Sequence, residues 1–295
     1  MRVTNQMIFD ASRLQTASAR ERLLDAQEKV TTGQRVVHPG DDPGAAGAII
    51  SHTISVQRFD TINQGIGRAT DESQLADGAL QNVSTLIARA RELAIQLGSD
   101  TYSAAERMGG AQEIRDISSQ IVTLMNTQEG GRYLFGGNVD RTPPFDPAGN
   151  YAGDTGIRQV EVAPGLLQNA SVRSDIALKG VGGGVDLFAA LHTLDLALSG
   201  NDSATVRTSI DSLDAAGTQV ATALTANGGI LNGFQSAANI GLTAKDTASK
   251  LLANLSEVDI FDAASKLTMA QQSLEATLAV ASKSFNMNLL DFLPR

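Results

Sequence analysis

The triplet Asp154-Thr155-Gly156 is the stretch that most clearly suggests catalysis, because it has the composition of the aspartic-protease motif. That chemistry needs two carboxylates that share one proton, and the chain has no second copy of the triplet. The preceding Ala152-Gly153 does not resemble a strand that would hold the aspartate rigid. We therefore predict that Asp154 organises a turn, while a homodimer could still supply a second carboxylate.

A glycine run, Gly180-Val181-Gly182-Gly183-Gly184, resembles a phosphate-binding loop, since backbone N–H groups near a helix start can hold anions. It lacks the Lys-Ser/Thr ending and the spacing of a dinucleotide site. A flexible joint is the better interpretation.

Metal and thiol chemistry find little support in the sequence. The histidines His38, His52 and His192 do not have metal-ligand spacing, and the absence of cysteine excludes disulfides and thiolate zinc sites. The pair Asp41-Asp42 could contact calcium but lacks the further acidic ligands of a recognisable loop, so helix capping is the better account. We expect no cofactor, no metal and no enzyme activity.

Composition favours long, narrow helical packing. The 295 residues carry a net charge of −9, and only 4% are aromatic, with no tryptophan. The acidic balance argues against nucleic acid and anionic membranes as partners, and no run of 18 apolar residues would span a bilayer. The first ten residues lack a basic region followed by an apolar one, so we expect no cleaved secretory signal.

Helical periodicity dominates both ends of the chain. A helix with a thin apolar stripe that includes Leu14 and Leu24 is expected from about residue 5 to 31, with Gly33 as its stop. Asp42 as N-cap and Pro43 at the first helical position should start a long helix that ends near Leu97.

The middle of the chain changes character twice. Ser103 and Glu106 have capping-box spacing and should open another helix. A β-rich insert follows, with strands expected at 132–135 and 159–162 among many Gly, Pro and Asp residues. Helical structure should resume at Asp186. One of the following helices should end at 227–229, where the sequence is Asn-Gly-Gly, and another helix boundary is expected near Asp259.

The C-terminal region carries a seven-residue apolar repeat, which we call the predicted seam. Its steps alternate between four and three, as in a coiled coil that needs a partner helix. Gln271 and Asn288 are either register-setting or tolerated polar positions. The apolar seam residues that we expect to form an assembly interface, together with Leu14 and Leu24, are Ile260, Ala264, Leu267, Leu274, Leu278, Ala281, Phe285 and Phe292.

The predicted fold is mainly α with a β-rich insert. Terminal coiled-coil segments (1–40 and 259–295) should bracket a helical bundle domain (41–130 and 186–258) and an outer insert domain (131–185). Because the thin stripe of the first helix offers little reason to fold alone, we expect both ends of the isolated chain to be mobile and to become ordered on assembly.

Several blocks resemble the bacterial flagellin family, and within it the flagellar hook-associated proteins at the junction between hook and filament. The stretch 168–172 and its surroundings depart from the family pattern, so the fold of the insert does not follow from the resemblance. The matching residues are Arg2–Met7, Thr32–Val36, Asp41–Ala46, Arg132–Gly137, Thr142–Phe145, Tyr151, Gly153-Asp154 and Leu289–Leu293.

The resemblance implies a structural subunit in which both terminal helices line a tube and the insert faces outward. It implies assembly with copies of itself, with a hook-associated protein on the hook side and with flagellin on the filament side. It also implies an export chaperone, an extracellular location in the flagellum, and export as an unfolded chain through the flagellar type III apparatus. The alternatives are flagellin itself, a helical effector secreted by a type III system, and a hydrolase that uses Asp154.

Overall fold

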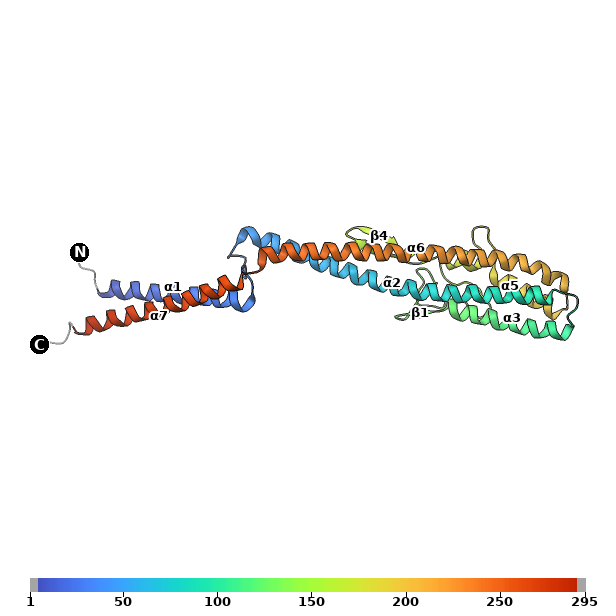
Figure 1. Ribbon diagram of the computed structural model, residues 1–295, viewed down its shortest axis with the longest axis horizontal. Coiled ribbons are helices and arrows are strands. Elements are labelled where there is room, and N and C mark those ends of the chain that lie inside the picture. Colours follow the sequence, from blue (N-terminus) through green and yellow to red (C-terminus); the bar gives the residue numbers. More distant parts are fainter. Residues whose placement is uncertain (1–4, 291–295) are drawn as a thin grey trace. The chain divides into compact units, whose positions relative to one another are not determined.

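Figure 1 shows a computed structural model, which describes the backbone of residues 5–290 and the side chains of residues 7 and 9–283. Long helices dominate, and the two sheets each have two antiparallel strands, which confirms the predicted fold class. The elements are α1 (Asn5–Thr32), α2 (Pro43–Leu97), α3 (Ala104–Met125), β1 (Gln128–Glu129), β2 (Arg132–Tyr133), β3 (Gln159–Ala163), β4 (Leu166–Asn169), α4 (Ser174–Lys179), α5 (Leu187–Ser199), α6 (Ser203–Ser256) and α7 (Ile260–Leu290).

The chain divides into two compact units. The terminal unit comprises residues 1–57 and 245–295, and the central unit comprises residues 58–244. Helices α2 and α6 each contribute to both units. The three-part division expected from the sequence stays a prediction.

Most helix ends lie where local sequence placed them. The Asp42 carboxylate accepts a hydrogen bond from the Ala45 N–H at 3.0 Å, and Pro43 is the first residue of α2. Ser103 and Glu106 form a reciprocal capping box at the start of α3. These caps satisfy N–H groups that a helix start leaves without partners.

One predicted helix end was wrong. Asn227, Gly228 and Gly229 lie inside α6, which continues without a break from Ser203 to Ser256. Asn227 is buried, and its Nδ2 donates to the backbone oxygen of Ser73 at 2.9 Å. A tertiary hydrogen bond to α2 therefore outweighs the local preference of Asn-Gly-Gly for a turn.

The first strand of the insert is shorter than expected, the second is present, and the insert also contains a further strand and one helix that the sequence did not predict. The strand expected at 132–135 is only Arg132–Tyr133, because Leu134 and Phe135 turn into the core of the central unit and are buried. β3 and β4 form a hairpin with an irregularity between Glu161 and Ala163. The unpredicted helix is α4.

Two apolar clusters form the core of the central unit. The larger one joins side chains of α2, α3, α5 and α6 with Leu134, Phe135 and Phe145. Helices α3 and α5 pack directly against each other (Figure 1). The smaller cluster places Val162 and Ala170 of the hairpin against α2 and α6, with Phe234 fully buried. The hairpin is thus fixed to the helices by apolar contacts.

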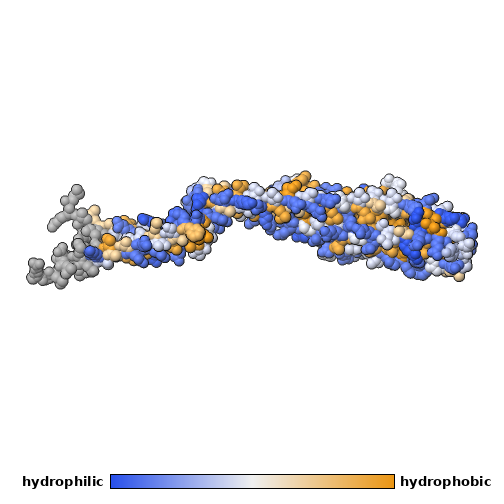
Figure 2. All heavy atoms as spheres, viewed as in Figure 1, coloured by the Kyte–Doolittle hydropathy of each residue, from blue (hydrophilic) through white to orange (hydrophobic). Residues whose placement is uncertain are grey.

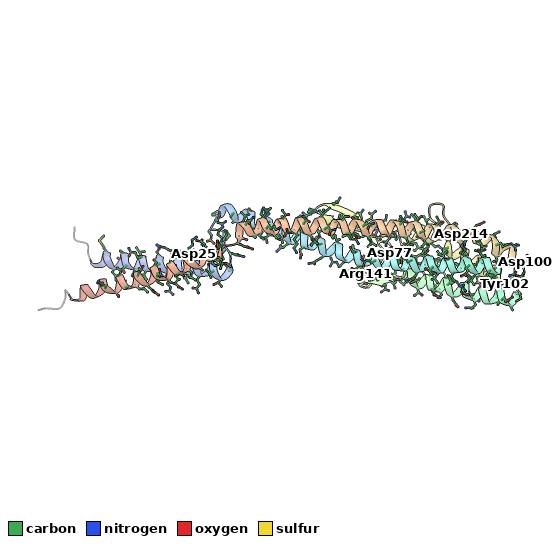
Figure 3. The ribbon with its side chains drawn as sticks, in the orientation of Figure 1. Asp25, Asp77, Asp100, Tyr102, Arg141 and Asp214 are labelled. Carbon is green, nitrogen blue, oxygen red and sulfur yellow. The ribbon has the colours of Figure 1, made fainter. Side chains whose placement is uncertain are left out.

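A buried arginine, Arg107, binds the backbone beside the turn that carries Asp100 and Tyr102. Figure 3 labels these two turn residues. Arg107 of α3 donates from Nε to the backbone oxygen of Leu97 and from Nη2 to that of Ser99, each at 2.9 Å, and from Nη1 to Asn201. The last carbonyls of a helix lack intrahelical partners and carry partial negative charge. Arg107 therefore caps the C-terminal end of α2.

Replacing Arg107 with Met should lower the free energy of unfolding of the central unit by about 2–4 kcal/mol, since buried carbonyls lose their donors. Thermal and urea unfolding followed by circular dichroism would measure the change. The control is Arg89→Met, because Arg89 forms only exposed ion pairs and exposed ion pairs contribute little to stability. Equal effects of the two substitutions would contradict the capping role.

Candidate assembly surface of the terminal helices

Helices α1 and α7 form an antiparallel pair in the terminal unit (Figure 1). Their least exposed side chains recur at steps of four and three, as in a coiled coil, and most of them are small. We call these sets the inner faces. The inner face of α1 consists of Ser12, Thr16, Ala19, Leu23, Ala26 and Val30, and that of α7 of Ala263, Leu267, Ala270, Leu274, Thr277 and Ala281.

The predicted seam and the inner face of α7 share one column, Leu267, Leu274 and Ala281, which is half-buried. In the predicted seam, this column pairs with the residues that stand four positions after each of its members. In the structure, α1 instead covers the residues that stand four positions before each of them. Those earlier residues include Ala263, which is only 3% exposed. Small side chains at these positions let the helix axes approach closely, which accounts for the choice of side.

The other side of the shared column is exposed, and we call it the open flank. It consists of Ala264, Gln271 and Leu278. Ile260 stands one heptad before Leu267 in the shared column and is itself exposed. Leu278 is 50% exposed, and on α1 Leu14 and Leu24 are 72% and 57% exposed. These three leucines lie outside the inner faces, and their role as contacts between subunits stays a prediction. The side chain of Phe285 and the whole of Phe292 lie outside the described residues.

The terminal unit places small residues inside and large ones outside. Its buried side chains, among those the structure describes, are Ala19, Ala26, Val36, Ala45, Ala248 and Ala263. Its exposed large apolar side chains are Met7, Phe9, Leu14, Leu24, Ile50, Ile54, Leu251, Ile260, Phe261, Met269, Leu278 and Val280. Apolar residues reach the visible surface of the terminal helices (orange in Figure 2). Large contiguous apolar patches on protein surfaces are typical of interaction sites.

A polar joint, residues 33–42 and 256–259, holds the ends of four helices together. Gln34 and Glu257 form an antiparallel bridge, and the Arg35 N–H donates to the backbone oxygen of Ser256 at 2.6 Å. The Arg35 guanidinium donates to the backbone oxygen of Leu255 and to the Asp42 carboxylate, each at 2.9 Å. Arg35 thereby connects the C-terminal end of α6 to the cap of α2.

Aspartates complete this joint. The Ala45 N–H and the Arg35 guanidinium lower the pKa of Asp42, and the His38 N–H lowers that of Asp41. Asp259 caps α7, since its carboxylate accepts from the Phe261 N–H at 2.9 Å. The ionised forms of Asp41 and Asp42 therefore stabilise the joint.

Charge is distributed unevenly between the two units. The terminal unit has 11 Lys and Arg against 12 Asp and Glu, a net charge of −1, and the central unit has 12 against 20, a net charge of −8. The sum is the −9 of the chain. Electrostatic repulsion between copies is therefore weaker for the terminal unit than for the central one.

Asp154 is a turn residue in the structure. Its carboxylate accepts from the N–H groups of Asn138 at 2.8 Å and Gly156 at 3.0 Å, and these bonds lower its pKa. It stabilises the turn that follows Tyr151, as the sequence predicted.

The other candidates from the sequence also have local structural roles. Asp41 accepts from the Val37 and His38 N–H groups, and the run 180–184 connects α4 to α5. Among the described residues, His, Asp and Glu side chains nowhere cluster as metal ligands. Within the same part of the chain, no helix is long and apolar enough to cross a membrane.

Comparisons with known proteins connect the chain to the flagellum. Residues 3–140 match the family described as "Bacterial flagellin N-terminal helical region". Flagellar hook-associated protein 3 of Salmonella typhimurium is 29% identical over 164 residues, 54% of this chain and 51% of that protein. Its namesake from Escherichia coli K12 is 31% identical over 157 residues, 52% of this chain and 49% of that protein. The chain thus matches about half the length of these relatives, and the resemblance seen in the sequence is confirmed.

Solved structures agree with the fold. FlgL from Bacillus cereus has a TM-score of 0.59 at 21% identity and covers 69% of this chain and 99% of its own. A structure titled as the flagellar junction protein FlgL from Legionella pneumophila has a TM-score of 0.54 at 14% identity, covering 64% and 99%. Similarity at this level of identity supports the architecture of the chain.

Acid should loosen the joint. A carboxylate whose pKa is lowered in the folded state stabilises it above the unfolded pKa, about 3.9 for aspartate, and this stabilisation is lost as pH falls through the folded value. The protection factors for amide hydrogen exchange at Val37, His38 and Ala45, each measured relative to the intrinsic exchange rate at the same pH, should therefore fall below about pH 3.9. The Asp42→Asn variant should weaken this pH dependence at Ala45 while keeping it at Val37, and an unchanged profile at both amides would contradict the assignment.

Proposed function

We propose that this chain is a structural subunit of the bacterial flagellum that forms the junction between hook and filament. The observation that carries the proposal is the terminal unit, where many large apolar side chains are exposed while the buried side chains of its described part are five alanines and Val36. Such a surface needs other helices to cover it. The relatives named hook-associated protein 3 and the neighbour titled as a flagellar junction protein support the same assignment.

In this proposal the two units have different tasks. The terminal helices pack against terminal helices of neighbouring copies through the open flank of α7, Leu14 and Leu24, and burial of each leucine contributes about 1.5–3 kcal/mol. The central unit has its own apolar clusters and folds before assembly. The division of the chain expected from the sequence, with coiled-coil segments, bundle and outer insert, fits these tasks and remains part of the proposal.

The partners follow from the same assignment. They are copies of the chain itself in a ring, a hook-associated protein on the hook side, flagellin on the filament side and a cytosolic export chaperone. Nucleic acid and membrane insertion have no place in this proposal, and neither does catalysis or a cofactor. The location is the extracellular flagellum, reached as an unfolded chain through the flagellar type III apparatus without a cleaved signal peptide.

Flagellin is the alternative with a specific observation in its favour. A flagellin of Clostridium tyrobutyricum is 34% identical over 107 residues, 35% of this chain and 28% of that protein. A filament subunit would also need an exposed apolar surface on its terminal helices. The two functions differ in whether the purified chain grows long filaments.

Deletion of the encoding gene should leave cells with hooks but without filaments, and with flagellin in the medium. Electron microscopy of cells and immunoblots of the medium would detect both effects, and the wild-type gene should restore filaments. A filament-bearing, motile deletion strain would refute the junction function. Loss of filaments without another flagellin in the medium, together with long filaments grown from the purified chain, would favour the alternative.

The open flank provides a sharper test. Leu278→Asp should abolish swimming or reduce it severely, since a charge would be buried between copies without a partner, while helicity and export of the chain stay unchanged. Gln272→Asp on the exposed side of the same helix adds the same charge and should leave swimming intact. Swimming halos, circular dichroism and immunoblots of the exported protein give the three readouts. Equal swimming by both variants would count against assembly through this flank.

A further inference from the structure

A polar cavity of about 510 Å³ lies in the central unit, between α2 and the β3–β4 hairpin. Charged side chains from three parts of the chain converge on it, although they are far apart in sequence. Arg68 and Glu72 come from α2, Arg132 and Asp140 from β2 and the loop that follows it, and Arg158 from the segment before β3.

The negative charge of the carboxylates at this cavity is smaller than the positive charge of its arginines. Glu72 lies 2.9 Å from Arg158 and 3.7 Å from Arg132, and Arg132 lies 3.0 Å from Asp140. Arg68 is exposed and forms no ion pair with any residue that the structure describes. Three guanidinium groups therefore face two carboxylates, which leaves one positive charge in a unit whose net charge is −8.

Arg158 is held at the cavity without enough acceptors. Its side chain is only 12% exposed, and its buried Nε and Nη1 atoms have no hydrogen-bond partner among the described residues. Nη1 meets Glu72 at ion-pair distance but without hydrogen-bond geometry. Buried donors are almost always satisfied in folded proteins, and a guanidinium is the side chain best suited to bind the paired oxygens of an oxyanion.

We propose that this cavity binds an oxyanion, a carboxylate, sulfate or phosphate group, with Arg68 and Arg158 as its principal donors. Arg68 supplies the uncompensated charge, and a small reorientation of Arg158 gives its guanidinium the acceptors that it lacks. Arg141, which follows Asp140 in the sequence, is exposed and adds positive charge to the loop after β2. Its position is labelled in Figure 3. The oxyanion is either a free ion or an acidic side chain of a second copy of this acidic chain. This inference does not depend on the flagellar function.

Calorimetric titration of the full-length chain with sodium sulfate, phosphate and citrate at low, matched ionic strength tests the free ion. We expect saturable binding to one site, weakened about tenfold by Arg68→Gln, since one charge-assisted hydrogen bond is lost. Arg91→Gln is the matched control: it removes the same charge from α2 but lies outside the cavity, where Arg91 pairs with Asp214. Circular dichroism confirms that both variants are folded.

Sedimentation velocity at low salt tests the second source. If copies supply the carboxylate, the wild-type chain should self-associate, and sulfate or Arg68→Gln should reverse the association while Arg91→Gln does not. Arg158→Lys provides an independent variant, because it keeps the charge but removes the two-pronged geometry, and it should weaken either kind of binding. The proposal is overturned if no anion binds more tightly to the wild type than to Arg68→Gln and self-association is the same in Arg68→Gln and Arg91→Gln.

Discussion

The close packing of α1 against α7 through alanines is the constraint on which the terminal unit depends. Alanine lets two helices approach closely, but it removes little apolar surface from water compared with leucine. The pair therefore gains little stability from its own contact, and helices of this kind derive most of their stability from tertiary packing. Because α1 covers the side of α7 that carries Ala263, the larger Leu278 on the other side of the shared column remains half exposed.

The central unit is built in the opposite way. Its large apolar side chains are inside, as Leu80, Phe135 and Phe234 illustrate, and Arg107 satisfies the carbonyls at the end of α2. It also carries nearly all of the net negative charge. Core, caps and charge together describe a unit that is stable in water, in contrast to the almost neutral terminal pair with its exposed apolar surface.

Sequence periodicity predicted the helices well, because caps and apolar repeats act locally. It identified the column of Leu267 and Leu274 but not the side of it that α1 covers. An apolar stripe three columns wide allows two pairings, and only the size of the facing side chains decides between them. The end expected at Asn227 failed for a related reason, since its hydrogen bond to Ser73 joins residues 154 positions apart. The cavity around Arg158 was likewise invisible, because only the folded insert brings Arg158 to Glu72.

The two connections in the joint differ in length. Ten residues, 33–42, join α1 to α2, whereas three, 257–259, join α6 to α7. An extended chain spans at most about 3.3–3.6 Å per residue, so the shorter connection becomes taut long before the longer one. Tension along the terminal helices would therefore load the covalent path through Glu257 and Asp259 first. The longer N-terminal connection would carry no tension until the bridge between Gln34 and Glu257 opened. That bridge would therefore break before the N-terminal connection is stretched.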